Sequence, residues 1–500
     1  MPTAISNDEW DLPRLKASIS FEEDVRYTSS QDQDTEFFDV KFYPYHDPKE
    51  TPIFAAVSKK HIVIYRLSST AGTPIELIQV LRDDDEGAIN CSCTWSKDSE
   101  TEIPWLCVAG WDARIKVYDV VHGVLVKTLV GHGAEINDLA TCPTNHYLIA
   151  SASQDTTVRI WSLDAVDEEQ PCLAILGGEG HSSGLLTTAF HDTGRYVLSA
   201  GHDNCVCMWT LPDLSERPRD KVPPPPVVVH YPHFFTSEVH SGIVDCVAFY
   251  GDLILSRACH EDIIVLWRIE GFSSRDAPPP PSSAPTTSDT ERLTRSAFVP
   301  TTASAAPQYT RMIQFHTPGS GHQFYMRFKL YHNEDKHPVL AFCNAHSTIL
   351  FWDLARLTGF HEFHTSLNTP GRDAHAQRPS WLQPVIPRQK ADAVSKLRDN
   401  AEDRDSVASG RTGSDVDPTS SLSNHYNQET LESWHNKYDV TRVDEAIRAH
   451  SQSAITIKDF IGRQVAWSPL GDWCVVVGSK NLAVILARWQ RKEKDDKKSG

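Results

Sequence analysis

The chain has 500 residues, 40% of them hydrophobic, and its 66 acidic against 48 basic residues give a formal net charge of −18. This acidity disfavours general nucleic-acid binding, which relies on cations that neutralise phosphates, and favours a basic protein partner such as a histone tail. The start, MPTAISNDEWDLPRL, has no apolar signal core and no apolar run is long enough to cross a bilayer, so neither secretion nor membrane insertion is expected.

The 11 cysteines are an odd number and lie mostly within apolar, strand-like runs. This distribution predicts buried, reduced thiols in an intracellular protein. No C-x-x-C pair occurs, and the two C-x-C spacings place both sulfur atoms on one face of a strand, which is more typical of packing than of a zinc site.

One pattern recurs along the chain: a Gly-His pair, an alternating strand, a second strand, a tight turn with an Asp, and a strand that ends in Trp. An Asp in the turn can accept hydrogen bonds from the His side chain and from turn amides, while Ser and Trp extend the network across the blade. The two clearest copies supply the predicted network residues His132, Ser153, Asp155 and Trp161, and His181, Ser199, Asp203 and Trp209.

Weaker copies bring the number of repeats to seven. In chain order they cover residues 37–67, 87–120, 131–163, 181–211, 240–269, 324–354 and 461–489. Seven is a common closing number for radial four-stranded blades, so the predicted fold is an all-β, seven-bladed WD-repeat β-propeller. The N-terminal stretch SISFEED is expected to pair into the last blade, which would seal the ring and remove open sheet edges.

The predicted organisation alternates blades with inserted segments. Both inserts are polar or rich in Pro, Ser and Thr and lack apolar periodicity, so we expect loops or largely disordered linkers there. In order, the parts are an N-terminal segment (1–36), blades one to five (37–270), a Pro/Ser/Thr-rich insert (271–315), blade six (316–358), a polar insert (359–458), blade seven (459–490) and a charged tail (491–500).

No P-loop, G-x-S-x-G or H-E-x-x-H motif is present, and the repeat accounts for His132, His181 and His240. The sequence therefore predicts a non-catalytic binding scaffold without a cofactor. Two other interpretations stay open. One is a general WD-repeat adaptor, for example a substrate receptor of a ubiquitin ligase, and the other is a propeller enzyme whose site is assembled from distant loops.

Several runs resemble the EED family, the propeller subunits of Polycomb histone methyltransferase complexes: VDCV followed by GDLILS, and also FYMRF, CTWSKDSETEIPWLCVAG, LVGHGAEIND and ILGGEGH. The resemblance touches all seven blades but not the N-terminal segment or the long inserts. It implies a nuclear protein that binds the methyltransferase catalytic subunit, the histone H3 tail and other Polycomb subunits, with no direct contact to nucleic acid or membrane. It also implies allosteric stimulation of methylation and gene silencing.

Members of that family carry an aromatic cage for trimethyl-lysine at one mouth of the channel. By motif, the resemblance assigns Phe54 in IFAAVS and the pair Phe324 and Tyr325 in FYMRF to this cage. Ring faces attract a quaternary ammonium, by about 0.5–2 kcal/mol per good contact. Convergence of these residues on one mouth would favour a methyl-lysine reader, and failure to converge would favour the adaptor.

The remaining cage position, two residues after Trp95, is occupied by Lys97. A cation at that position would repel a cationic ligand unless it turned outward into solvent. Met326 and Arg327 follow the aromatic pair and are expected to border the peptide groove. No residues are assigned to the surface that binds the methyltransferase.

Overall fold

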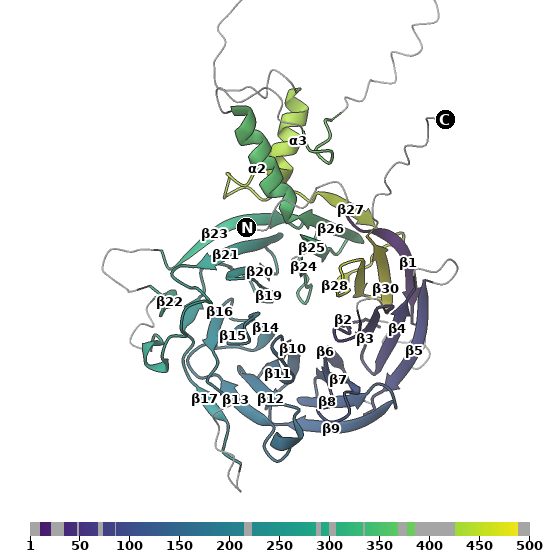
Figure 1. Cartoon of the computed structure of the whole chain (residues 1–500), viewed down its shortest axis with the longest axis vertical. Coiled ribbons are helices and arrows are strands. Elements are labelled where there is room, and N and C mark those ends of the chain that lie inside the picture. The colour runs from purple at the N-terminus through teal and green to yellow at the C-terminus, as the bar shows by residue number, and fades with distance from the viewer. Residues whose placement is uncertain are drawn as a thin grey trace, which may run out of the picture.

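The computed structural model describes residues 11–21, 35–47, 50–68, 74–85, 87–214, 223–286, 292–299, 307–333, 336–368, 378–385 and 426–488. Its strands form seven separate sheets arranged around a central axis (Figure 1). The predicted seven-bladed β-propeller is therefore confirmed.

Each blade begins at the channel with its innermost strand and runs outward. The first three blades are β2 (Asp39–Phe42), β3 (Ile53–Val57), β4 (His61–Leu67) and β5 (Ile75–Arg82); β6 (Asn90–Lys97), β7 (Pro104–Gly110), β8 (Arg114–Asp119) and β9 (Val124–Val130); and β10 (Ile136–Cys142), β11 (Asn145–Ser153), β12 (Val158–Ser162), β13 (Cys172–Leu176) and β17 (Val227–Val229). Blades 4 and 5 are β14 (Leu185–Phe190), β15 (Tyr196–Gly201), β16 (Val206–Thr210), β18 (Phe234–Thr236) and β22 (Thr294–Ser296); and β19 (Val244–Tyr250), β20 (Leu253–Ala258), β21 (Ile263–Ile269) and β23 (Tyr309–His316). Blades 6 and 7 are β24 (Lys329–Asn333), β25 (Lys336–Cys343), β26 (Thr348–Asp353) and β27 (Ser451–Ala454); and β28 (Gly462–Trp467), β29 (Trp473–Gly478), β30 (Leu482–Ala487) and β1 (Arg14–Ser20).

The ring is closed by β1, which pairs antiparallel with β30 as the outer strand of blade 7. The closing strand starts at Arg14 and ends at Ser20, so it contains the first three residues of the predicted stretch SISFEED, whose residues 22–24 fall outside the described residues. Because β1 and β30 come from opposite ends of the chain, their pairing satisfies an edge that would otherwise be open.

The middle strands of the blades are buried on both faces, as in β29, where five of six residues are buried. Outer strands alternate or are exposed, as in β9. Four tryptophans at 1% exposure or less, Trp161, Trp209, Trp267 and Trp352, pack between sheets. All 11 cysteines are buried and unpaired, and burial raises the pKa of the Cys107 thiol to about 12, which keeps it protonated.

Both predicted inserts contain ordered elements, so the expectation of loops and linkers was wrong for these parts. The range 271–315 contains β22 and most of β23, and β23 is the outer strand of blade 5. The range 359–458 contains most of helix α2 (Leu354–Asn368), together with helix α3 (Gln428–Tyr438) and β27. The two helices project together from blade 6 (Figure 1).

A small set of apolar residues orders these helices although the surrounding sequence is polar. Leu357, Phe360 and Phe363 are at most 6% exposed and belong to one buried cluster with Trp434 and Tyr438. Spacings of three residues place such side chains on one face of a helix. None of the helices in the described ranges is long and apolar enough to cross a membrane.

Candidate functional site

The innermost strands of the blades line the central channel, and their first residues gather at one of its two mouths. We call this end the Tyr325 mouth. Its apolar residues come from five blades, and each lies at or shortly before the start of an innermost strand. They are the buried residues Cys91, Leu186 and Tyr325, with Phe38, Ile89 and Ile243 packed against them.

Tyr325 spans this mouth from blade 6 to blades 2 and 3. Its hydroxyl lies 2.5 Å from the carbonyl oxygen of Asn137 and 3.1 Å from that of Cys91, and it donates to these acceptors. Burial raises the pKa of the phenol well above its ordinary value, so it stays protonated as a donor. Its φ of +63° is uncommon for a bulky residue, and these bonds help to hold it there.

Two further aromatic residues, Phe38 and Phe324, lie at the same mouth as this tyrosine. The ring of Phe38 lies 6.3 Å from that of Tyr325, at an interplanar angle of 83°. Phe324 is 46% exposed, and its ring lies 6.3 Å from that of His202 in blade 4. Its carbonyl oxygen accepts from Arg463 of blade 7 at 3.0 Å, which ties the aromatic pair to the neighbouring blade. Phe38, Phe324 and Tyr325 therefore meet at one mouth.

Arg327 lies beneath the mouth and connects three blades. It is 4% exposed, its Nη1 is 2.7 Å from Asp138 Oδ1, and its Nη2 donates to the carbonyl oxygens of Asn137 and Leu186 at 3.0 and 2.9 Å. Its guanidinium also lies 4.5 Å from the centre of the Tyr325 ring. Burial alone would lower the pKa of Arg327, but the Asp138 carboxylate outweighs it, so the guanidinium stays charged.

The two residues expected to border a peptide groove are therefore internal. Met326 is fully buried, and its backbone N–H donates to Asp245 at 3.1 Å. Arg327 is engaged in the network beneath the mouth and reaches the wall of the channel cavity below it, so both residues support the Tyr325 mouth from inside the ring.

Phe54 does not reach the Tyr325 mouth. It is fully buried in β3 opposite Phe42, and their rings lie 5.5 Å apart, with the ring of Tyr65 at 5.3 Å. Phe42 is the last residue of β2, whereas Phe38 precedes its first residue. Phe54 therefore packs in the core, so it does not converge with Phe324 and Tyr325, and its assignment to the cage was wrong.

Lys97 lies at the far end of its strand from the mouth. It is the last residue of β6, six residues beyond Cys91, which corresponds to about 20 Å of extended chain. Its Nζ is 2.9 Å from Glu102 Oε2 and 5.2 Å from the centre of the Tyr45 ring. The expected repulsion between this cation and a cationic ligand therefore does not arise at the Tyr325 mouth.

The aromatic residue that the sequence interpretation missed is Phe38. Its signal is weak, namely an aromatic pair directly before the first innermost strand, in FFDVKF. Phe37 of this pair is fully buried, whereas Phe38 is partly exposed.

Hydrogen-bonded chains of four side chains stabilise blades 3, 4 and 5. In each, a buried His contacts a carboxylate through Nδ1 and a Ser hydroxyl through Nε2, and the same hydroxyl accepts from a Trp indole N–H at 2.8 Å. This pattern fits a neutral imidazole with its proton on Nδ1. The chains are His132, Asp155, Ser151 and Trp161; His181, Asp203, Ser199 and Trp209; and His240, Glu261, Ser256 and Trp267.

The serine of blade 3 was misassigned from the sequence. Ser151, four residues before the turn Asp155, contacts His132 at 2.6 Å. Ser153 instead donates to the Ala134 carbonyl oxygen at 3.0 Å. Both serines project to the same side of β11 because side chains alternate along a strand, so the sequence pattern did not show which of them contacts His132.

Blade 5 uses Glu261 where the other two blades use Asp, and the sequence pattern did not single it out. Burial opposes ionisation of this carboxyl group. Hydrogen bonds from His240 and from the backbone of Ser241 outweigh burial and lower the pKa of Glu261 to about 2.

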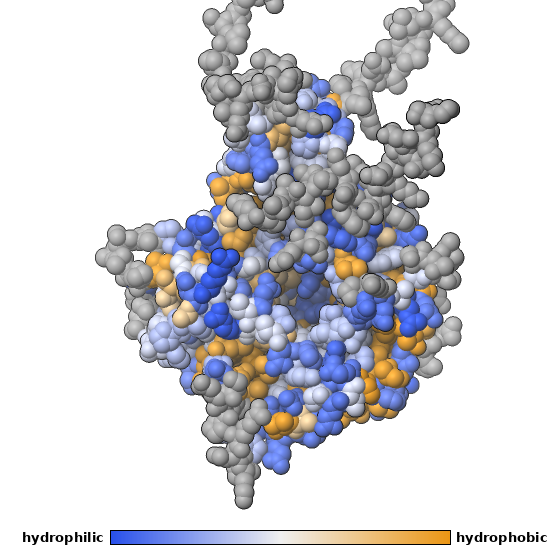
Figure 2. Space-filling model, viewed as in Figure 1, coloured by the Kyte–Doolittle hydropathy of each residue, from blue (hydrophilic) through white to orange (hydrophobic). Residues whose placement is uncertain are grey.

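The opposite end of the channel opens into a cavity of about 500 Å³ with a mixed polar and apolar lining. Its lining includes Lys41, Thr94, Thr141 and Lys329. Burial and the charge of Lys41 lower the pKa of Lys329. Figure 2 shows hydrophilic residues around the central opening.

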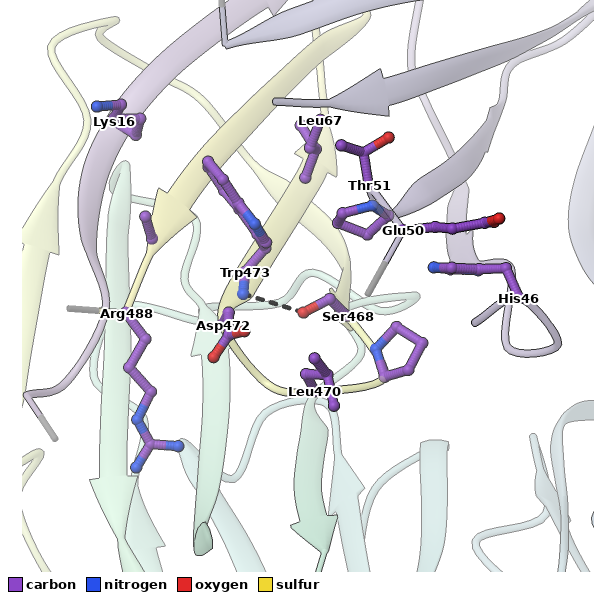
Figure 3. Close-up of a pocket in the computed structure, with 13 residues that line it drawn as sticks. Lys16, His46, Glu50, Thr51, Leu67, Ser468, Leu470, Asp472, Trp473 and Arg488 are labelled. Carbon is purple, nitrogen blue, oxygen red and sulfur yellow. Dashed lines mark hydrogen bonds between the residues drawn. The ribbon is translucent and has the colours of Figure 1, made fainter. Parts of the chain in front are cut away.

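A second cavity, of about 380 Å³, lies where blade 7 meets blade 1 (Figure 3). Trp473 and Leu67 form apolar walls, Glu50 and Asp472 supply carboxylates, and the backbone N–H of Trp473 donates to Ser468 Oγ at 3.0 Å. The cavity is built from the ring-closure junction and contains none of the predicted cage residues. In the described ranges, no group of three or more His, Cys, Asp or Glu side chains is arranged to hold a metal ion.

Comparison with known families and structures extends this description. A family model described as "WD domain, G-beta repeat" matches residues 123–162 and 170–210, which cover parts of blades 2 to 4. The Polycomb protein esc of Drosophila melanogaster is 30% identical over 51% of this chain and 60% of its own length.

Several matches span nearly the whole chain, among them the following two. A crystal structure of the Chaetomium thermophilum polycomb repressive complex 2 (PRC2) contains a chain with 48% identity and a TM-score of 0.82, over 97% of this chain and 99% of that one. The Polycomb protein EED of Chaetomium thermophilum is 46% identical over 97% of both sequences. The chain therefore belongs to the EED family of Polycomb WD-repeat proteins.

Proposed function

We propose that this chain is a non-catalytic, nuclear scaffold subunit of a Polycomb-type histone H3 lysine methyltransferase complex, and that its Tyr325 mouth reads trimethyl-lysine in the H3 tail. The observation that carries the reader function is the contact between Phe38 of blade 1 and Tyr325 of blade 6 at one channel mouth, where the adjacent residue Phe324 is exposed. A general adaptor would not need aromatic rings gathered at this point.

The chemistry of the site suits a quaternary ammonium. Such a cation is weakly hydrated and gains about 0.5–2 kcal/mol from each well-placed ring face. The rings of Phe38 and Tyr325 are nearly perpendicular, so they form two adjacent walls of a binding site, and Phe324 is exposed next to Tyr325 in the chain. A related PRC2 structure from Chaetomium thermophilum, with a chain 48% identical to this one and a TM-score of 0.81, is described as a complex with H3K27me3 and H3K27M.

A patch on the outer edge supports the scaffold function. It lies on β5 and β9, the outer strands of blades 1 and 2. These strands are neighbours, because the side chain of Gln79 in β5 lies next to Gly123 in the turn before β9. Its members are 37–67% exposed: Leu77, Ile78, Val124, Leu125, Val126 and Val130. Figure 2 shows hydrophobic colour along this edge at the lower right. Exposed apolar surface of this kind marks protein–protein contact, and we propose the methyltransferase catalytic subunit as its partner.

Reading and stimulation would be coupled through binding free energy. If an occupied mouth favours the active state of the catalytic subunit, the methylated tail raises activity and produces positive feedback in gene silencing. The Arg327 network directly under Tyr325 joins blades 3, 4 and 6 and is the rigid element through which the mouth would act.

Calorimetric titration of the purified chain tests the reader function. The ligands are an H3K27me3 peptide and its unmodified form, and the variants are Phe38→Ala and Phe324→Ala, with exposed Val166→Ala on the rim of blade 3 as control. We expect preference for the methylated peptide in the parent and control, and loss of that preference in both cage variants. Equal affinity of the parent chain for the two peptides would favour the general adaptor.

Co-purification tests the scaffold function separately. Leu125→Asp places a charge within the apolar patch and should weaken capture of the catalytic subunit without changing peptide affinity, because the patch lies on the outer edge. Unchanged capture would contradict the assignment of this patch.

A further inference from the structure

Trp111 is 60% exposed, which is unusual for so large an apolar side chain. Within the described ranges, Trp111 and Phe324 are the exposed members of the Trp and Phe side chains. Both lie beside the Tyr325 mouth. An exposed ring that is held in place near other rings is more typical of a binding surface than of a core.

The backbone around Trp111 is tightly held. Trp111 lies in the turn between β7 and β8, and its N–H donates to the Ile89 carbonyl oxygen at 3.0 Å. A Cβ atom on Gly110 would lie 1.9 Å from this same oxygen, so the close approach requires glycine. On the other side of the turn, Asp112 is 2.7 Å from Lys116 Nζ. These contacts fix where the indole leaves the backbone.

The side chain lies beside Cys91, close to Tyr325. The Trp111 indole acts to lower the pKa of the Cys91 thiol, against the larger effect of burial, and the carbonyl oxygen of Cys91 accepts from the Tyr325 hydroxyl at 3.1 Å. Ile89 and Cys91 pack in the same cluster as Tyr325 and Phe38. Trp111 and Tyr325 therefore meet on the same short segment of blade 2.

Blade 2 presents only a small thiol at its innermost strand, since Cys91 is 4% exposed and has no ring. We propose that Trp111 supplies the missing wall, so that blade 2 contributes to the trimethyl-lysine site through its β7–β8 turn and not through its innermost strand. This inference rests on the proposed reader function. Tryptophan gives the strongest cation–π contact among the aromatic side chains, and the exposed ring of Trp111 is free to make it.

The test combines three variants with two ligands. The ligands are the H3K27me3 peptide and an analogue in which an uncharged tert-butyl group replaces the trimethylammonium group. Trp111→Ala and Trp111→Leu should weaken binding of the charged peptide about 2- to 30-fold, and Trp111→Phe should retain most of the affinity. The tert-butyl peptide should bind Trp111→Leu and the parent chain with similar affinity, because it has shape without charge.

The outcomes separate the two proposals. If Trp111→Ala and Trp111→Leu bind the methylated peptide within about twofold of the parent, while Phe38→Ala loses the preference, Trp111 is not a wall and the reader function stands. A parent chain without preference for the methylated peptide overturns both. Because Trp111 is exposed, its variants should unfold at the temperature of the parent chain, and equal loss of both ligands in Trp111→Leu would indicate a structural role and overturn the inference.

Discussion

Replacing Arg327 with methionine should destabilise the propeller by about 3 kcal/mol, at the lower end of the range for breaking a buried ion pair. The substitution keeps the aliphatic stem but removes the charge 2.7 Å from Asp138 and two donors to backbone carbonyls. Asp138 keeps backbone donors at Leu139 and Thr188, both at 3.0 Å, which places the cost at the lower end. The cation–π contact to Tyr325 is lost as well.

The assay is equilibrium unfolding in urea, followed by tryptophan fluorescence. Arg66→Met is the matched control, because Arg66 pairs with Glu76 at 3.2 Å while the two side chains are 42% and 63% exposed. Breaking an exposed pair costs less than about 1 kcal/mol. A double-mutant cycle with Asp138→Asn should give a coupling of about 1–3 kcal/mol. Equal effects of Arg327→Met and Arg66→Met, or a coupling near zero, would refute the view that this network holds the blades together.

Three further predictions concern pH, the misassigned aromatic and basic residues, and the thiols. The pKa of Glu261 is about 2, which is below the value of a glutamate in the unfolded chain. The ionised carboxylate therefore contributes fully to stability above about pH 4.5, and this contribution is lost as the pH falls toward 2. The urea midpoints measured at pH 6 and pH 3 should differ less in Glu261→Gln than in the parent. Phe54→Ala should lower the free energy of unfolding by about 3–5 kcal/mol. Phe54→Leu and Lys97→Ala should keep the preference for the methylated peptide in calorimetry. Loss of that preference in either variant would support the cage assigned from the sequence. Burial raises the pKa of the Cys91 thiol to about 12. The native chain should therefore react with a chromogenic thiol reagent far more slowly than the urea-unfolded chain. Equal reaction rates of the native and unfolded chains would contradict this burial.

The family resemblance and the repeat spacing together predicted the architecture well. Blades 3 to 5 carry the clearest local features, namely alternation along three strands, a turn with an acidic residue, and a Trp six residues later, and such features can be recognised from the sequence. Ring closure could also be predicted, because a propeller needs a partner for its last edge. The helices at blade 6 could not, since their order depends on a few apolar side chains, such as Phe360 and Trp434, that come together from segments far apart in the chain.

The residues of the candidate site were predicted less completely than the fold. Phe324 and Tyr325 were found because they lie in a distinctive motif, but in the first repeat Phe54 was assigned and Phe38 was missed. Which of them reaches the mouth depends on which end of an innermost strand faces that side of the ring. Trp111 belongs to a turn whose position is set by the contact of Gly110 with another strand. The sequence by itself determined the blades because their pattern is local, whereas only the tertiary structure decided which rings share a mouth, because that depends on how separate blades are placed around one axis.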